Sequence, residues 1–126
     1  MKVALVAHDN MKDSLIAFVK ENETRLEKFE LTGTGTTSKR IMAETNLKVL
    51  GLHSGPLGGD QEIGALIPSR ALQGIIFFRD PLTAQAHEPD VNALLRLCDV
   101  YNVPLATNFS SAEAILDYLC KKLETE

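Results

Sequence analysis

The 126-residue chain contains no tryptophan, few aromatic residues (6%) and only two cysteines, Cys98 and Cys120. Both cysteines lie in amphipathic segments and lack the CxxC spacing of a structural zinc site or a redox pair. The chain also has no excess of basic residues, because 13 Lys and Arg stand against 17 Asp and Glu. The resulting net charge of −4 argues against nucleic acid or an anionic membrane as the main partner.

Long hydrophobic runs are missing as well. No run approaches the roughly 20 apolar residues that span a bilayer, and His8 and Asp9 interrupt the apolar start before a signal-peptide core would be complete. We therefore expect a cytoplasmic protein whose cysteines are buried or half-buried free thiols. The sequence has no repeat, low-complexity tract or linker, and its length fits one domain, residues 1–126.

Five short apolar runs alternate with amphipathic segments along the chain. The runs are continuous rather than alternating, which is typical of strands that are covered on both faces. They predict an α/β fold, namely a single-domain, doubly wound (Rossmann-like) three-layer sandwich with a five-stranded, mostly parallel sheet. The expected strands are 3–7, 29–32, 48–52, 74–78 and 103–106, and the expected helices are 11–22 (with an extension to 28 left open), 37–45, 60–69, 89–101 and 111–123.

Polar side chains follow every predicted strand, at the edge where ligands bind in such folds. Turns alone do not require so many titratable groups. The sets after the five strands are His8, Asp9 and Lys12; residues 32–40; residues 53–55; residues 79–90; and residues 107–108.

The segment TGTGTTSKR, residues 32–40, matches neither the dinucleotide fingerprint nor the Walker A spacing. Gly35 would let the backbone turn toward a ligand, and Thr36 and Thr37 offer hydroxyls where a helix starts. Two interpretations remain open. The threonines form an ordinary N-cap, or they bind a small mononucleotide or sugar phosphate to which Lys12 supplies the positive charge.

Acidic residues recur at the same edge, and each has an ordinary interpretation. Asp60 would be an N-cap, Asp90 a complement to a helix dipole, and Asp80 the start of a turn. Together with Asp9 they would converge at one edge, where like charges and partial burial raise the pKa of at least one carboxylate. Such a group is a general base near neutral pH. His87 lacks HxH or HExxH spacing, which favours acid–base or hydrogen-bonding use over a metal site.

Four strings in the sequence resemble the motifs of the methylglyoxal synthase family. They are ALVAHDNMK, TGTGTT, HSGPLGGDQEIGALI and DPLTAQAHEPDVNALLRLCDVYNVPLATN, which appear in the family's order and cover nearly the whole chain. The resemblance implies a lyase that eliminates phosphate from dihydroxyacetone phosphate, with no metal and no organic cofactor. It also implies a homo-oligomer, commonly a hexamer, that inorganic phosphate inhibits.

The resemblance also implies roles for individual residues. Asp60 matches the catalytic base, Asp9 and Asp90 match its acidic partners, and His87 matches the histidine that contacts the substrate oxygens. The positions that match substrate- and phosphate-binding residues are His8, Lys12, Thr34, Gly35, Thr36, Thr37, Ser54 and Gly55.

Two other functions stay open at this point. The fold also resembles the allosteric domain of carbamoyl phosphate synthetase, which would make the chain a non-catalytic effector-binding module. An unrelated sugar-phosphate isomerase with a carboxylate base is the second alternative. The retained acids and His87 favour the enzyme over the binding module.

Overall fold

The computed structural model describes residues 1–52, 59–82 and 88–125, and of residues 59–61 and 88–91 only the backbone. The strands of the described part are β1 (Lys2–Ala7), β2 (Glu30–Thr34), β3 (Val49–Leu52), β4 (Gly74–Phe78) and β5 (Leu105–Ala106). The helices are η1 (Asp9–Met11), α1 (Lys12–Glu21), α2 (Glu23–Leu26), α3 (Gly35–Glu44), α4 (Gly59–Leu66), α5 (Glu88–Tyr101) and α6 (Phe109–Glu124).

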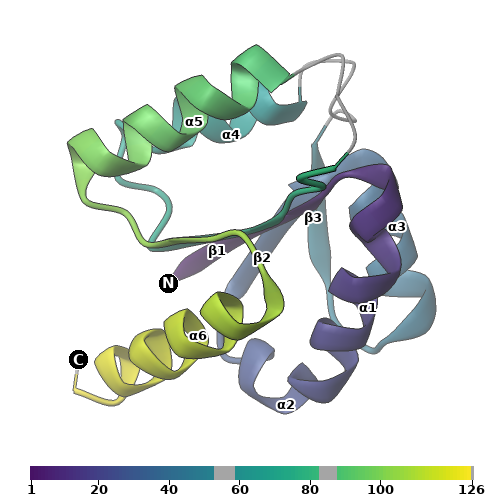
Figure 1. Ribbon diagram of the computed structural model, residues 1–126. Coiled ribbons are helices and arrows are strands. Elements are labelled where there is room, and N and C mark those ends of the chain that lie inside the picture. Colours follow the sequence, from purple (N-terminus) through teal and green to yellow (C-terminus); the bar gives the residue numbers. More distant parts are fainter. Residues whose placement is uncertain (53–58, 83–87, 126) are drawn as a thin grey trace.

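The strands form one sheet in the order β3-β2-β1-β4-β5, and every pairing is parallel. Helices α4 and α5 cover one face of this sheet, while α1, α3 and α6 cover the other (Figure 1). Each face has its own buried apolar cluster, centred on residues such as Leu5 and Ile76 on one side and Val6 and Phe77 on the other. The predicted doubly wound three-layer α/β fold is therefore confirmed.

The second strand is longer than its sequence predicts. It continues to Thr34, and α3 begins at the next residue, so the segment 32–40 is a strand–helix junction rather than a loop. Gly33 pairs with Leu5 of β1 on one side and Gly51 of β3 on the other. Glycine is a weak strand former, so the apolar pattern predicts that this strand ends at residue 32, two residues too early. Here it is required, because a Cβ at Gly33 would lie 2.7 Å from the carbonyl oxygen of Leu5.

Replacing Gly33 with alanine is expected to destabilise the protein by about 1–3 kcal/mol, since a backbone carbonyl cannot move aside. Gly64 is the matched control, because a Cβ there would make an ordinary 3.5 Å contact with Leu97. Gly64 lies inside α4, so Gly64→Ala should be neutral or stabilising by up to about 1 kcal/mol. Urea unfolding of both variants measures the two effects, and equal stability of the two would contradict this account of Gly33.

The first predicted helix is interrupted at Asn22. Helix α1 ends at Glu21, and the short α2 follows after this one residue. The Asn22 side-chain amide donates to the Phe18 carbonyl at 2.9 Å, and its oxygen accepts from Arg25 at 2.7 Å. An asparagine that hydrogen-bonds the backbone in this way competes with continued helix. The structure therefore excludes a single helix that extends to residue 28.

Both cysteines are free and buried, as expected. Burial, helped by the charge of Asp99, raises the pKa of the Cys98 thiol to about 11. The thiol therefore stays protonated at neutral pH, and the thiolate is the reactive form of cysteine. Within the described residues no helix is both long and apolar enough to cross a membrane.

Candidate functional site at the carboxyl edge of the sheet

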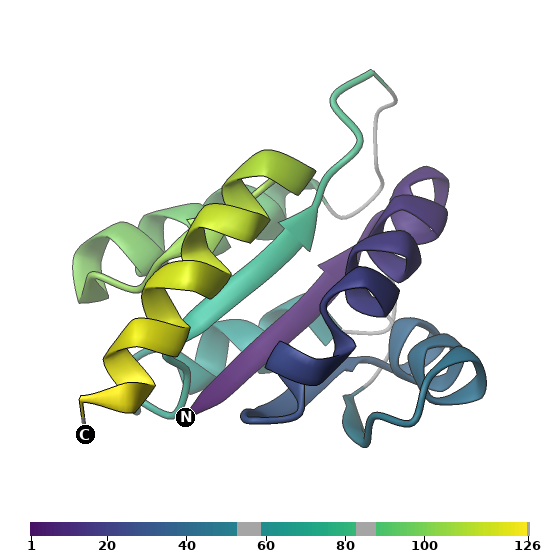
Figure 2. The same ribbon diagram turned by 90° about the horizontal axis from the view of Figure 1, so that it is seen from below.

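The strand order reverses between β1 and β4, which run side by side in the same direction (Figure 2). Such a reversal leaves a crevice beyond the carboxyl ends of the two strands, where doubly wound proteins bind their ligands. Immediately after β1, the backbone N–H of His8 donates to the carbonyl of Phe78, the last residue of β4, at 3.1 Å. The exits of β1 and β4 are therefore joined at this point.

His8 is buried at the crevice, with 3% of its surface exposed. The backbone N–H of Asp80 donates to its Nδ1 atom at 2.9 Å. An imidazole nitrogen that accepts a hydrogen bond carries no proton, so this contact assigns a neutral ring with its proton on Nε2. The ring packs edge-on against Phe77, with 5.1 Å between the ring centroids. His8 thus presents one defined hydrogen-bond donor.

Asp80 is also buried, and both of its carboxylate oxygens accept hydrogen bonds. Oδ1 accepts from the backbone N–H of Leu82, and Oδ2 accepts from the side-chain amide of Asn10, each at 3.0 Å. The contact with Leu82 confirms that Asp80 starts a turn. The contacts with Asn10 and His8 could not be predicted, because they join residues 70 and 72 positions apart.

Lys12 joins the exits of β1 and β2, as the sequence predicts. This first residue of α1 places its ammonium 2.8 Å from Oδ1 of Asp9 and 3.0 Å from Oγ1 of Thr36. Asp9 is almost fully exposed, with 92% of its side-chain surface accessible, whereas the Lys12 side chain is 19% exposed. The positive charge is therefore held at the start of α3.

The start of α3 offers backbone N–H groups beside this ammonium. Thr34 occupies the N-cap position, but its hydroxyl makes no capping hydrogen bond to the helix backbone and instead pairs with the hydroxyl of Thr37 at 3.2 Å. The simple N-cap interpretation of Thr36 and Thr37 is therefore wrong, because α3 begins at Gly35 and both residues lie inside its first turn. A helix start next to a lysine attracts anions, because the N–H groups and the helix dipole both favour negative charge. The junction of β2 and α3 can hold a phosphate group.

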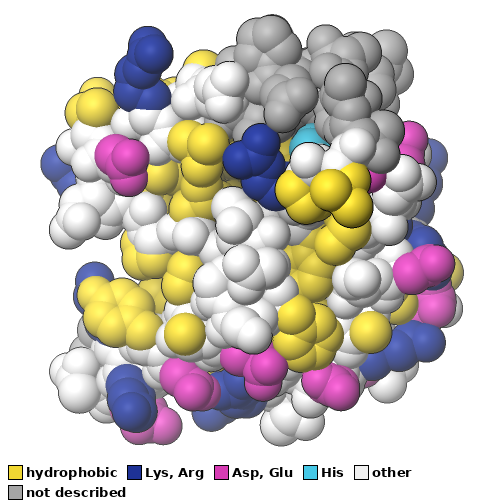
Figure 3. All heavy atoms as spheres, viewed as in Figure 1, with side chains coloured by type: hydrophobic (Ala, Val, Ile, Leu, Met, Phe, Trp, Pro, Cys, Tyr) yellow, Lys and Arg dark blue, Asp and Glu magenta, His cyan; other side chains and the backbone are white. Residues whose placement is uncertain are grey.

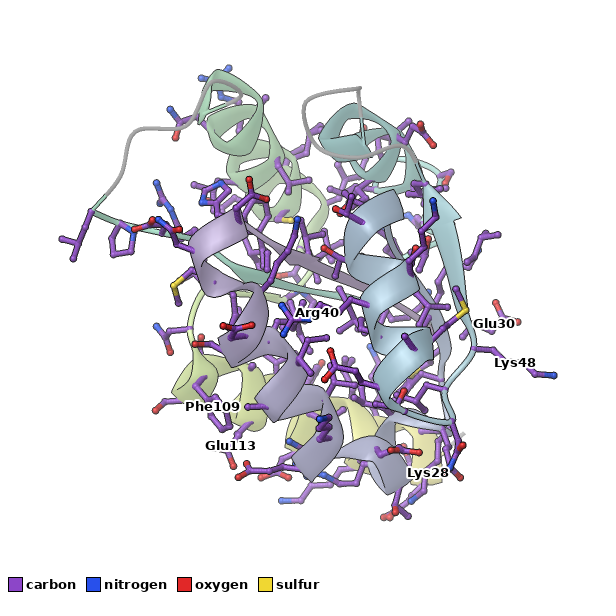
Figure 4. All side chains as sticks on the ribbon, turned by 90° about the vertical axis from the view of Figure 1, so that its right-hand side faces the viewer. Lys28, Glu30, Arg40, Lys48, Phe109 and Glu113 are labelled. Atoms are coloured by element: carbon purple, nitrogen blue, oxygen red, sulfur yellow. The ribbon has the colours of Figure 1, made fainter. Side chains whose placement is uncertain are left out.

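An ion-pair network links α1 and α3, the helices that carry Lys12 and Thr36. Arg40 of α3 lies between the two helices and pairs with Asp13 of α1 and with Glu44 of its own helix (Figure 4). Lys20 of α1 also reaches Glu44, at 3.1 Å. The hydrogen bond from Arg40 lowers the pKa of Glu44, and Lys20 lowers it further. These ion pairs connect the two helices, but their side chains are partly or largely exposed, so each pair contributes little to stability.

Five of the predicted site positions fall where side chains are not described. Asp60 is the second residue of α4 and Asp90 the third residue of α5, and both helices begin at the carboxyl edge of the sheet (Figure 1). Asp60 therefore lies inside the first turn, not at the N-cap that its sequence context suggests. Ser54, Gly55 and His87 lie outside the described residues.

A hollow of about 220 Å³ lies at the opposite edge of the sheet, where α4, α5 and α6 end (left in Figure 3). Arg70 lies 5.9 Å from the ring centroid of Tyr101, and Lys122 lies 5.8 Å from that of Tyr118. Helix carboxyl ends carry partial negative charge, which cations complement. The two cations therefore have a structural explanation, and the carboxyl edge remains the candidate site.

The chain resembles known proteins over most of its length. A family model described as an MGS-like domain matches residues 14–107 of the chain. A methylglyoxal synthase of Bacillus cytotoxicus is 60% identical over 119 residues, which are 94% of this chain and 91% of that protein. The chain belongs to the methylglyoxal synthase family. A methylglyoxal synthase of Bacillus mycoides shows the same identity and coverage.

A solved structure of this family has the same fold. The crystal structure of the methylglyoxal synthase from Elizabethkingia anophelis NUHP1 superposes with a TM-score of 0.86 at 45% identity, covering 91% of this chain and 76% of that one. The described residues that match the family's site positions are His8, Asp9, Lys12 and residues 34–37. All of them lie at the carboxyl ends of β1 and β2.

Proposed function

We propose that the protein is a methylglyoxal synthase, a carbon–oxygen lyase that converts dihydroxyacetone phosphate to methylglyoxal and inorganic phosphate. The observation that carries the proposal is the pairing of Lys12 with Thr36 at an uncapped helix start, next to a buried neutral histidine. A phosphate group fits the first feature, and an oxygen that gains negative charge fits the second.

The reaction begins with removal of a proton from the hydroxymethyl carbon beside the ketone, which yields an enediolate. Asp60 is the proposed base, and its basicity is raised by Asp90 and by desolvation. The dipole of α4 acts in the opposite direction, since it favours the ionised carboxylate. Asp9 contributes less than its sequence position suggests, because its charge is exposed and lies beside Lys12. Asp90 is thus the acidic partner that we expect to matter most.

His8 and His87 are proposed to bind the substrate oxygens. The Nε2–H of His8 donates to the oxygen on which negative charge develops as the proton leaves. Because Nδ1 accepts from the backbone of Asp80, Nε2 carries the proton of the ring and is its donor. His87, as the family resemblance implies, hydrogen-bonds the substrate oxygens and helps to move protons among them. No metal or organic cofactor takes part in this scheme.

Phosphate leaves in the second step, and its orientation decides the product. The breaking carbon–oxygen bond must stand roughly perpendicular to the enediolate plane, so that it overlaps the π system. Lys12, Ser54, Gly55 and residues 34–37 are proposed to hold the phosphate at this torsion angle. An isomerase that uses the same intermediate has to prevent this alignment. The enol that is released then tautomerises to methylglyoxal.

We further propose that residues 1–126 act as one methylglyoxal synthase-like domain, in the cytoplasm and as a homo-oligomer, with a hexamer as the specific expectation. Inorganic phosphate, a product, would inhibit by occupying the same cradle at Lys12. The net charge of −4 does not favour phosphate at long range. Local geometry at the start of α3 therefore has to supply the affinity.

Incubation with dihydroxyacetone phosphate tests the proposal directly. We expect methylglyoxal and inorganic phosphate to form in equal amounts. The assay measures both products, and glyceraldehyde 3-phosphate as well. Formation of glyceraldehyde 3-phosphate instead would identify an isomerase. If no product forms while phosphate esters still bind, the chain is an effector-binding module like the allosteric domain of carbamoyl phosphate synthetase.

A further inference from the structure

Three residues form a hydrogen-bond chain across the crevice between β1 and β4. Asn10, in η1, donates its side-chain amide to Asp80, and the backbone N–H of Asp80 donates to His8. Asp80 and His8 are buried, with 7% and 3% of their surfaces exposed, whereas Asn10 is exposed. The last contact assigns the tautomer of His8, as described above.

We propose that Asn10 and Asp80 are positioning residues that keep His8 neutral and oriented for catalysis. The proposal rests on the proposed function, because His8 would otherwise have no reaction to serve. Neither residue needs to touch the substrate. The Asp80 carboxylate binds Leu82 with one oxygen and Asn10 with the other. These two contacts fix the turn after β4, and this turn points the N–H of Asp80 at the imidazole.

The hydrogen bond between Asn10 and Asp80 is the one in this series that a side-chain substitution can remove. The side-chain amide of Asn10 donates to the Asp80 carboxylate and so links the turn after β4 to the exit of β1. When a buried carboxylate loses a hydrogen-bond donor, it shifts to recover one. Such a shift moves the Asp80 backbone and weakens the hydrogen bond to Nδ1 of His8. The proton can then occupy Nδ1, which leaves Nε2 as an acceptor facing an oxygen that needs a donor.

A polarity swap tests the proposal. Asn10→Asp places a second carboxylate against Asp80, and like charges at hydrogen-bond distance repel. In the double variant Asn10→Asp/Asp80→Asn, the amide introduced after β4 can donate to the carboxylate introduced in η1, while its oxygen still accepts from Leu82. The hydrogen bond between positions 10 and 80 is then restored, with donor and acceptor exchanged. Asn46→Asp is the charge-matched control, because Asn46 is exposed near the start of β3, at the other edge of the sheet.

The readouts are steady-state kinetics and the ¹⁵N NMR spectrum of histidine-labelled protein. The chain has 3 histidines, and the loss of signals in His8→Asn assigns those of His8. In the unaltered protein we expect an unprotonated Nδ1. In Asn10→Asp we expect a mixture of tautomers and a roughly tenfold lower kcat, typical of losing one hydrogen bond to a charged group, with KM nearly unchanged. The double variant should recover both, and Asn46→Asp should change neither.

Three results would count against the proposal. The first two are an unchanged His8 spectrum in Asn10→Asp and an altered spectrum without loss of kcat. Failure of the double variant to recover, although urea unfolding shows it folded, would also count against it. If the unaltered protein makes no methylglyoxal, the proposed function fails. The His8 spectra of the same variants then still decide whether Asn10 and Asp80 set the tautomer.

Discussion

Replacing Asp60 with asparagine is expected to lower kcat by about 10²- to 10⁴-fold, the range that a positioned general base contributes. The amide keeps the shape of the side chain but cannot accept a carbon-bound proton. Binding should survive the change, because the phosphate contacts proposed at Lys12 and Thr36 come from other elements. Phosphoglycolate, which resembles the phosphorylated enediolate, should bind the variant as tightly as before or more tightly.

Turnover of dihydroxyacetone phosphate and calorimetric binding of phosphoglycolate measure the two halves of this prediction. Asp99→Asn is the control, since it makes the same chemical change at an exposed position of α5. Near-normal turnover in Asp60→Asn would remove Asp60 as the base. Loss of both turnover and phosphoglycolate binding would point to a structural role in the first turn of α4.

Replacing Lys12 with alanine should weaken phosphate binding by about 10- to 100-fold, because a hydrogen bond to a charged group is worth roughly 1.5–3 kcal/mol. The effect should appear in KM for dihydroxyacetone phosphate and in the inhibition constant of inorganic phosphate alike. The variant also leaves Thr36 without its ammonium partner and Asp9 without its ion pair. With the Lys12–Asp9 ion pair lost, the negative charge of Asp9 would oppose phosphate binding further.

The matched control is Lys20→Ala, on the same helix. The Lys20 side chain is 52% exposed and pairs with Glu44 rather than with the threonines. Lys20→Ala changes the net charge by the same amount as Lys12→Ala. It should change KM less than about twofold, since exposed ion pairs contribute little. A similar rise in KM for both variants would mean that overall charge, not the Lys12 contact, governs phosphate affinity. Unchanged affinity in Lys12→Ala would place the cradle elsewhere.

The sequence predicts the layers of this fold better than the ends of its elements. Buried parallel strands are continuous apolar runs, so the five strands could be located from hydrophobicity alone. The end of β2 could not, because the space that Gly33 fills is set by the carbonyl of Leu5 on the next strand. The order of the strands also depends on pairings between distant residues, such as Val3 with Gly74.

The site divides in a similar way. Lys12 and Thr36 could be paired from the sequence, because each follows a strand and the strands were expected to share one edge. The tautomer of His8 could not, because it is set by a backbone N–H 72 positions away. Asp80 illustrates the difference within one residue. Its turn with Leu82 follows from local sequence, whereas its contact with Asn10 follows only from the tertiary structure.

The central position of β1 has a consequence for synthesis of the chain on the ribosome. The first strand to emerge finds β2 on one side, but its other edge stays open until β4, which begins at Gly74, has been made. An unpaired strand edge is a template for pairing with other chains. Nascent chains stalled before Gly74 should therefore aggregate through residues 2–7, and His8 should lack its partner until β4 inserts. Insertion of β4 would therefore both cover the open edge of β1 and complete the candidate site around His8.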